Sequence, residues 1–231
     1  MPSDLCLLRD ELTAAPAAVF PSAKAGPIDW RRLDYLAHGN SRQRSAHALL
    51  TAGVWDKLAA QCADMALVST VAIGLDRPGS DLDIVCQHPE PAAFAAALAN
   101  QGWQVAQKGA AIWLAEQSVT CADGYPWPLE LYLTPEPLEH LNGWRHLSLM
   151  AALLEQFGAA FYHEVLRLRF DKGLKGEAAM CHLLGLAGDP YAALLTLEGG
   201  ELAPLVWQPK AMGSLSTSTS SHLDRAQRTF S

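Results

Sequence analysis

The sequence has no run of roughly 18 apolar residues, the minimum that a membrane-spanning helix requires. Its amino-terminal region mixes Asp4, Arg9, Asp10 and Glu11 into the apolar pattern. A signal peptide would instead place an uninterrupted apolar segment behind a basic start. We therefore expect no membrane partner and a cytoplasmic protein.

Basic residues are also scarce, with 17 Lys and Arg against 24 Asp and Glu and a formal net charge of −7. Nonspecific nucleic-acid binding depends on clustered basic side chains that neutralise phosphates. The composition therefore argues against duplex nucleic acid as a partner. It favours a small-molecule or protein partner.

Metal-binding spacings of cysteine and histidine are missing too. The five cysteines lie far apart, with no Cys-x-x-Cys pair, and we expect reduced and mostly buried thiols. His140 and His146 share one predicted helix and His163 lies on the next, which is not a zinc spacing. We found no internal repeat. These observations argue against the common zinc and dithiol chemistries.

A pair of carboxylates, Asp81-x-Asp83, leads into an apolar run. Successive side chains of a strand alternate between its faces, so Asp81 and Asp83 should point to one side. Paired carboxylates can hold hard divalent cations such as Mg²⁺, together with substrate phosphates. The alternative is structural, because Asp is common at strand starts and in turns such as Asp76-Arg77-Pro78-Gly79-Ser80.

Two other features favour a metal and phosphate site. Ser69 and Thr70 follow the strand-like residues 66–68, where hydroxyls and backbone amides can meet phosphate oxygens. Glu130 stands alone inside the apolar run 129–133, and an unpaired charge is costly to bury there. We therefore expect Glu130 to face a cation or a solvated cleft.

Cationic and polar side chains recur further along the chain. Arg145 falls within an apolar helical stripe, beside Asn142 and His146. It could pair with a buried acid, or its guanidinium could bind phosphate. Lys172 and Lys175 follow a predicted helix over residues 159–169, either as solvated charges near its end or as phosphate ligands.

Periodicity and turn residues predict an α+β fold with a central mixed β-sheet of about five strands, flanked by helices and followed by a helical region. We expect an amino-terminal helix and linker in residues 1–27, a domain over 28–134, a packed helical region over 135–212 and a disordered tail over 213–231. A helix over 29–38 should end at a left-handed Gly39, and Ser41 should begin the next. The predicted strands cover residues 66–73, 81–87, 103–107, 110–114, 118–122 and 129–133.

Together these residues resemble the nucleotidyltransferase superfamily typified by DNA polymerase beta. The signature of that superfamily begins with a hydrophobic residue, then Gly, and then either Gly or Ser. After about a dozen further residues it continues with Asp-hydrophobic-Asp-hydrophobic. This chain has Val68-Ser69-Thr70 and then Asp81-Leu82-Asp83-Ile84. The resemblance implies the superfamily's fold. It also implies that Glu130 corresponds to the third carboxylate of that superfamily, which a later strand carries.

More narrowly, the chain resembles a bacterial domain family of unknown function, number 4269, over roughly residues 30–197. It departs from that family at Ser69, where relatives have Gly, and in Lys175-Gly176-Glu177-Ala178, where they have Lys-Thr-Glu-Pro. The shared segments are Ser80 to Ile84, Asn142-x-x-Arg145-His146, Lys172-x-x-Lys175-x-Glu177 and Gly188-Asp189-Pro190-Tyr191.

The resemblance implies transfer of a nucleoside monophosphate from a nucleoside triphosphate, with ATP the expected donor, to a hydroxyl of a small-molecule or protein acceptor. The alternative is a nucleotide-sensing or protein-binding module of the same fold, with Ser69 marking a relaxed phosphate turn. Asp81, Asp83 and Glu130 would be catalytic and would bind Mg²⁺ or Mn²⁺. The expected phosphate ligands are Ser69, Thr70, Ser80, Arg145, Lys172 and Lys175, with Asp76, Asn142 and His146 as further cleft residues.

Overall fold

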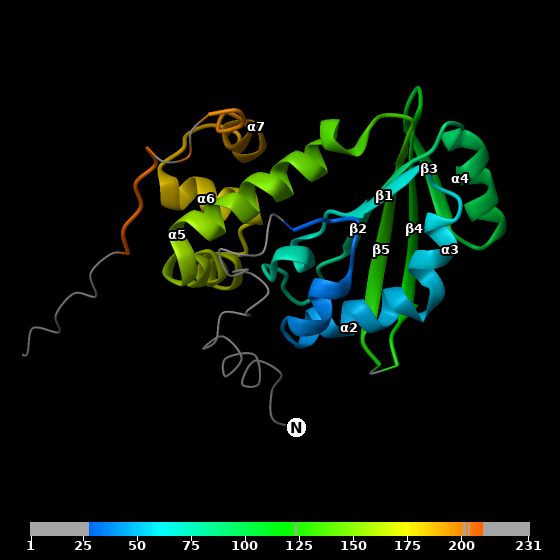
Figure 1. The fold of residues 1–231 in the computed structure, drawn as a ribbon, viewed down its shortest axis with the longest axis horizontal. Helices are drawn as coiled ribbons and strands as arrows, with labels where there is room; N and C mark the ends of the chain where they lie inside the picture. The colour runs from blue at the N-terminus through cyan, green and yellow to red at the C-terminus, as the bar shows by residue number, and fades with distance from the viewer. Residues whose placement is uncertain (1–27, 123, 201, 203, 210–231) are drawn as a thin grey trace, which may run out of the picture.

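The computed structural model describes residues 28–122, 124–200, 202 and 204–209. A five-stranded mixed sheet with flanking helices forms one part, and helices α5 to α7 form the other (Figure 1). This arrangement confirms the predicted α+β class. The helix expected near the amino terminus and the tail over residues 213–231 lie outside the described residues.

The sheet has the strand order β1-β2-β5-β4-β3. Strands β2 and β5 are parallel neighbours, whereas the pairs β1–β2, β4–β5 and β3–β4 are antiparallel. The two short strands predicted at 110–114 and 118–122 form one continuous strand, β4. The strands are β1 Asp64–Leu67, β2 Leu82–Gln87, β3 Gln104–Gly109, β4 Ile112–Thr120 and β5 Pro126–Thr134.

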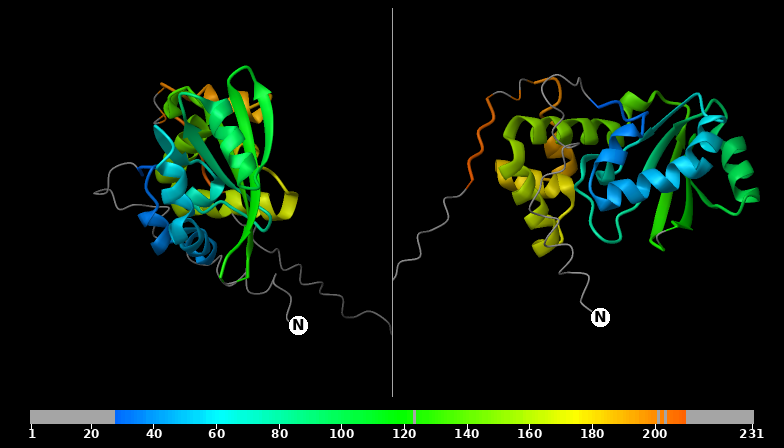
Figure 2. Two further views of the ribbon diagram at one scale, coloured as in Figure 1. Left: turned by 90° about the vertical axis from the view of Figure 1, so that its right-hand side faces the viewer. Right: turned by 60° about the horizontal axis from the view of Figure 1, so that its bottom comes forward.

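The two faces of the sheet differ in polarity because side chains alternate along each strand. Leu82, Ile84, Leu129 and Leu131 are buried on one face, which helices cover (Figure 2). Asp83 and Glu130 are half-buried, and their register in the strands puts them on the opposite face. The covering helices are α2 Ser41–Leu49, the π-helical η2 Leu50–Val54, α3 Trp55–Ala59 and α4 Pro91–Asn100.

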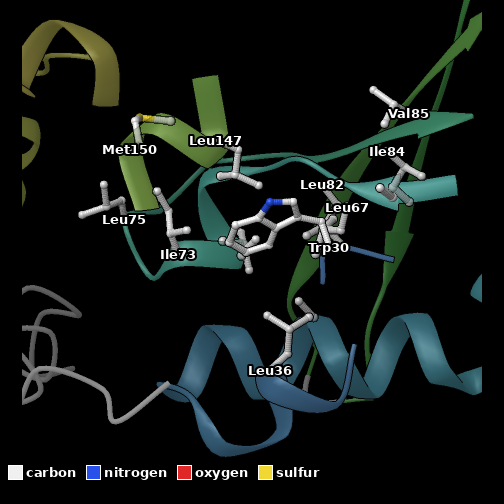
Figure 3. Close-up of a cluster of buried hydrophobic side chains, with 14 of the residues drawn as sticks. Trp30, Leu36, Leu67, Ile73, Leu75, Leu82, Ile84, Val85, Leu147 and Met150 are labelled. Atoms are coloured by element: carbon white, nitrogen blue, oxygen red, sulfur yellow. The ribbon is translucent and has the colours of Figure 1, made fainter. Parts of the chain in front are cut away.

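The strand predicted over residues 66–73 is wrong in its second half. β1 ends at Leu67, and residues Thr70–Ile73 form the 3-10 helix η3. Ser69 caps η3 by accepting a hydrogen bond from the Val71 amide, a local bond that competes with strand pairing. Ile73 packs in the core with Trp30, which also lies near Leu147 of α5 (Figure 3).

The helix expected over 29–38 is present only as the 3-10 helix η1, Asp34–His38, and the left-handed cap at Gly39 is wrong. Gly39 has φ −82° and ψ −160°, an extended conformation. Glycine is suited to this position because a Cβ there would collide with Gln43. Gln43 and Asn40 form a capping box that begins α2, with their two hydrogen bonds at 2.8 and 2.9 Å.

The carboxyl-terminal helices pack around a long kinked one. Helix α5, Asn142–Lys172, bends at Gly158. Two shorter helices, α6 Gly176–Leu184 and α7 Pro190–Leu195, pack against it (Figure 1). The 3-10 helix η4, Leu138–His140, precedes α5. In the described part of the chain, none of the helices combines the length and apolar character needed to cross a membrane.

Candidate functional site

A cavity of about 710 Å³ opens between the polar face of the sheet and helices α5 and α6. Its volume lies within the range typical of small-molecule sites. One wall comes from β2, β5 and the turn 77–81, and the other comes from the first turns of α5 and α6, together with Arg169 and Tyr191. The cavity can therefore accommodate a ligand that touches both parts of the protein.

Three acidic side chains, Asp81, Asp83 and Glu130, lie on the sheet wall of this cavity. Asp83 and Glu130 are direct register partners in the parallel pair β2–β5. Asp81 immediately precedes β2 and is exposed. The position of Glu130 follows from the parallel pairing, which brings a distant part of the sequence beside the Asp-x-Asp segment.

Burial and repulsion from neighbouring carboxylates disfavour ionisation of Asp83 and Glu130. Burial, followed by the charges of Asp81 and Glu130, raises the pKa of Asp83 to about 7. Burial also raises the pKa of Glu130, with Asp81 and Glu116 adding to the effect. A cation bound between these carboxylates would remove the cost of keeping them charged.

Across the residues that the structure describes, no three His, Cys, Asp or Glu side chains form a preformed metal-binding group. Mg²⁺ does not require one, since it is commonly held by one or two carboxylates, water and substrate phosphates. Asp81 and Asp83 offer hard oxygen donors on one cavity wall. The donor set fits a magnesium–nucleotide complex better than an all-protein metal cage.

Ser69 does not line the cavity and is 1% exposed. Its hydroxyl donates a 2.6 Å hydrogen bond to the Asp81 carbonyl oxygen and accepts one from the Val71 amide. Ser69 thus joins η3 to the start of β2 and lies outside the cavity in which phosphate was expected to bind. Its φ of −72° also needs no glycine. The neighbouring Thr70 does line the cavity.

The turn before β2 contributes Ser80 but not Asp76 to the cavity. The Ser80 hydroxyl accepts a 3.0 Å hydrogen bond from the Arg77 amide. Asp76 is buried in an ion pair with Arg42. The Arg42 guanidinium stacks 4.3 Å from the centre of the Trp127 ring. Burial outweighs this ion pair and raises the pKa of Asp76.

Of the three predicted cationic ligands, only Lys175 lines the cavity. A hydrogen bond with the Tyr191 side chain raises the pKa of Lys175. Lys172 is exposed at the end of α5 and lies outside the cavity lining. Arg145 also lies outside it, because its guanidinium pairs with Glu198 through Nε at 2.9 Å. Arg145 thus pairs with an acid, but with a partly exposed one.

Asn142 and His146 both line the cavity near the start of α5. The His146 Nε2 atom lies 3.0 Å from the Tyr191 carbonyl oxygen. The Asn142 side-chain oxygen accepts a 3.1 Å hydrogen bond from Arg145. His146 thus makes the buried hydrogen bond expected of a core histidine while remaining at the cavity edge.

Four cavity residues, Arg77, Arg169, Glu177 and Tyr191, were absent from the sequence-based set of site residues. Glu177 and Tyr191 belong to segments that carry the family resemblance, and Arg77 lies in the turn before Asp81, so each had a usable signal. Arg169 had none. It reads as one more cation near the end of an amphipathic helix, and only the packing of α6 against α5 places it in the site.

Fold and site define an α+β protein with an acidic sheet wall facing a cavity lined partly by cations. A family model described as Domain of unknown function (DUF4269) matches residues 47–197, which is more than half of the chain. The chain therefore belongs to this family, and the match includes every residue that lines the cavity. No curated protein and no solved structure matches the chain.

Proposed function

We propose that this chain is a metal-dependent nucleotidyltransferase. It transfers a nucleoside monophosphate from a nucleoside triphosphate, with ATP the expected donor, to a hydroxyl of a small-molecule or protein acceptor. The observation that carries the proposal is the pairing of Asp83 with Glu130 across β2 and β5, beside Asp81, on the wall of one cavity. The opposite wall supplies the cations that a triphosphate needs.

Asp81 and Asp83, with Glu130 beside them, would hold Mg²⁺ or Mn²⁺. Such an ion offsets negative charge that develops on the reacting phosphate oxygens. The raised pKa of Asp83 supports this assignment, since part of its cause is repulsion among the three carboxylates. Their closeness is electrostatically unfavourable in the absence of a cation.

The reaction joins the acceptor oxygen to the α-phosphorus and breaks the bond from that phosphorus to the bridging oxygen of the β-phosphate. Pyrophosphate leaves, and the hydroxyl proton passes to the Glu130 carboxylate. Thr70, Ser80 and Lys175 line the cavity where they can orient the triphosphate. Most of the catalysis would come from such positioning and charge stabilisation.

The acceptor would approach Glu130 from the side of β4, along the polar face of the sheet. Glu116 and Ser118 are exposed on this face, and Glu116 is the register partner of Glu130. This side of the site carries the acidic Glu116 as well as Lys108, and the whole chain has a net charge of −7. This charge balance favours a small molecule or a protein hydroxyl over duplex nucleic acid.

The test uses the full chain with each of the four nucleoside triphosphates labelled at the α-phosphate, in Mg²⁺ or Mn²⁺, with and without cell extract. We expect pyrophosphate release and transfer of label to an acceptor. Asp83→Asn and Asp81→Asn should each lower the rate roughly 100-fold or more. Asp56→Asn, at an exposed position on α3 outside the cavity, should leave it unchanged.

Two other outcomes would reject transfer. Magnesium-dependent binding of a nucleotide with no pyrophosphate release would favour the nucleotide-sensing alternative. If none of the four nucleotides bound in a magnesium-dependent manner, both the transferase and the nucleotide-sensing proposals would be rejected.

A further inference from the structure

Arg169 is a buried cation that the reaction described above does not use. It lies on α5, is 5% exposed and lines the cavity. Its Nε atom has no hydrogen-bond acceptor among the residues that the structure describes. Within the same residues, no carboxylate lies within ion-pair distance of its guanidinium. A buried charge is ordinarily paired, so this cation requires an explanation.

A second guanidinium increases the cost of keeping Arg169 charged. Arg77 donates a 3.2 Å hydrogen bond from Nη1 to the Arg169 carbonyl oxygen, and both side chains line the cavity. Burial, followed by repulsion from Arg77, lowers the pKa of Arg169. Glu177 and Asp76 offset this only in part, by attraction over longer distances. An anion between the two guanidiniums would stabilise both.

The amino end of α6 reaches the same place. The helix begins at Gly176 and has nine residues, and its N-cap residue, Lys175, makes no side-chain capping bond. A Cβ atom at Gly176 would lie 3.1 Å from the Met150 Sδ atom, 3.3 Å from the Arg169 Nη1 atom and 3.7 Å from the Thr70 Cγ2 atom. Glycine therefore lets the first turn of α6 lie close to the Arg169 guanidinium. Helix amino ends favour anions through their unpaired amides and the helix dipole.

We propose that Arg169, Arg77 and the amino end of α6 form a phosphate subsite that binds the β- and γ-phosphates of the nucleoside triphosphate, the part that leaves as pyrophosphate. This assignment rests on the proposed function. Lys175 connects the subsite to the carboxylates, because its charge acts on both Asp83 and Glu130 while it immediately precedes Gly176. One extended polyphosphate can therefore bridge the acidic wall and the two guanidiniums.

Neither Arg169 nor Arg77 was among the phosphate ligands expected from the sequence. Arg169 and Arg77 take the place expected for Arg145 and Lys172, which lie outside the cavity lining. A guanidinium suits this position because it stays charged when buried and presents several N–H donors in one plane. Arg169 would contact the substrate directly through its guanidinium, which lies at the cavity lining.

The test is calorimetric binding of inorganic tripolyphosphate to the full chain, in EDTA and again in Mg²⁺. Arg169→Gln should weaken binding roughly 10- to 100-fold, the loss expected for hydrogen bonds to a charged group. Arg167→Gln is the matched control, because Arg167 is exposed on the same helix and pairs with Glu164. It should leave the affinity unchanged, and Arg77→Gln should weaken binding by a smaller factor.

Folding of the variants is checked by urea unfolding. We expect the Arg169→Gln midpoint to equal or exceed that of the wild type, because the substitution removes an unpaired buried charge. Gly176→Ala provides a second test that leaves the charge unchanged, since the added methyl would crowd the Met150 sulfur and the Arg169 guanidinium and displace the latter. It should weaken tripolyphosphate binding about two- to tenfold, the effect of one lost neutral hydrogen bond.

Several outcomes would overturn the subsite. These are equal affinities in Arg169→Gln and Arg167→Gln, no tripolyphosphate binding by the wild type in either condition, or ATP binding that tripolyphosphate does not compete with. The last result would show that the subsite does not hold the β- and γ-phosphates of the nucleotide. If tripolyphosphate binding depends on Arg169 but no nucleotide is ever transferred, the proposed function fails and the subsite stands.

Discussion

At the scale of single residues, the alternation of strand side chains predicted most of the acidic wall. Asp83 and Glu130 lie on the face opposite Leu82 and Leu129, as their spacing requires. The position of Ser69 outside the cavity lining could not be predicted, because the bond from the Val71 amide and the bond to the Asp81 carbonyl oxygen depend on how η3 folds against β2. A sequence shows which residues carry hydroxyl groups, but it does not show which atoms those hydroxyls will bond in the fold.

Arg145 and Arg169 illustrate the same limit for cations. Arg145 sits within an apolar helical stripe and could pair with a buried acid or bind phosphate, whereas in the structure it pairs with the partly exposed Glu198. Arg169 looks like a surface residue in the sequence, but it is buried beneath α6. Helical periodicity gives the direction of a side chain on its own helix. The residue that this side chain contacts is determined by packing between segments that are distant in the sequence.

The raised pKa of Asp83 predicts a pH-dependent stability of the metal-free protein. In the unfolded chain Asp83 titrates near pH 4, whereas in the fold it titrates near pH 7. Between these values the folded protein keeps a proton that the unfolded chain has released, so stability falls as pH rises. From pH 5 to pH 8 this contribution should fall by roughly 2 to 3 kcal/mol.

Urea unfolding in EDTA at pH 5 and pH 8 measures this effect. The decrease in unfolding free energy should be larger for the wild type than for Asp83→Asn, and the difference isolates Asp83 from other titrating groups. Identical decreases in the two proteins would contradict the proposed burial and repulsion at Asp83.

At the scale of elements, the sequence predicted the order of strands and helices better than their ends. Residues 66–73 read as one apolar strand, but Val71 and Ile73 are buried from a 3-10 helix instead. Two predicted strands merged into β4 because Ala115 and Gln117 continue the ladder with β5. Apolar runs report burial reliably, whereas the choice between a strand and a tight helix depends on neighbouring packing.

The kink in α5 depends on one residue. Gly158 has φ 72° and ψ −163°, a conformation that is nearly confined to glycine. A Cβ atom there would meet no other atom within 4 Å, so the cost of a side chain is conformational and not steric. Gly158→Ala should therefore destabilise the protein by about 1 to 3 kcal/mol.

Chemical unfolding of Gly158→Ala, monitored by circular dichroism, checks this prediction. Ala160→Gly, two residues further along the same helix, is the comparison. It should cost about 1 kcal/mol or less through helix propensity alone. An unfolding midpoint for Gly158→Ala equal to that of the wild type would show that α5 can straighten without loss.

At the scale of the whole molecule, the cavity joins two parts that share one core. Trp30 donates a 3.4 Å hydrogen bond from its indole to the Ser148 hydroxyl of α5, and it packs near Ile73 and Leu147 (Figure 3). The mixed sheet with a helical region beside it could be predicted from the chain. The way α6 closes over the acidic wall could not, because it depends on the bend at Gly158 and on side-chain packing.

A ligand that spans the cavity should therefore order both walls together. With Mg²⁺ and a non-hydrolysable ATP analogue, amide hydrogen exchange should slow in the turn 77–81 and in residues 175–177, with the two regions responding at the same ligand concentration. Asp83→Asn should reduce both effects, and Asp56→Asn neither. Protection confined to one wall would contradict a ligand that bridges them.

The parallel pairing of β2 with β5 also has a consequence for synthesis of the chain. The whole β3–β4 hairpin is translated between these two strands, so Asp83 and Glu130 cannot become neighbours until β5 has emerged and docked. Contacts so distant in sequence tend to form slowly. The electrostatic penalty of the acidic wall thus arises only when β5 docks, and the same step buries Leu129 and Leu131 on the opposite face, which compensates for it.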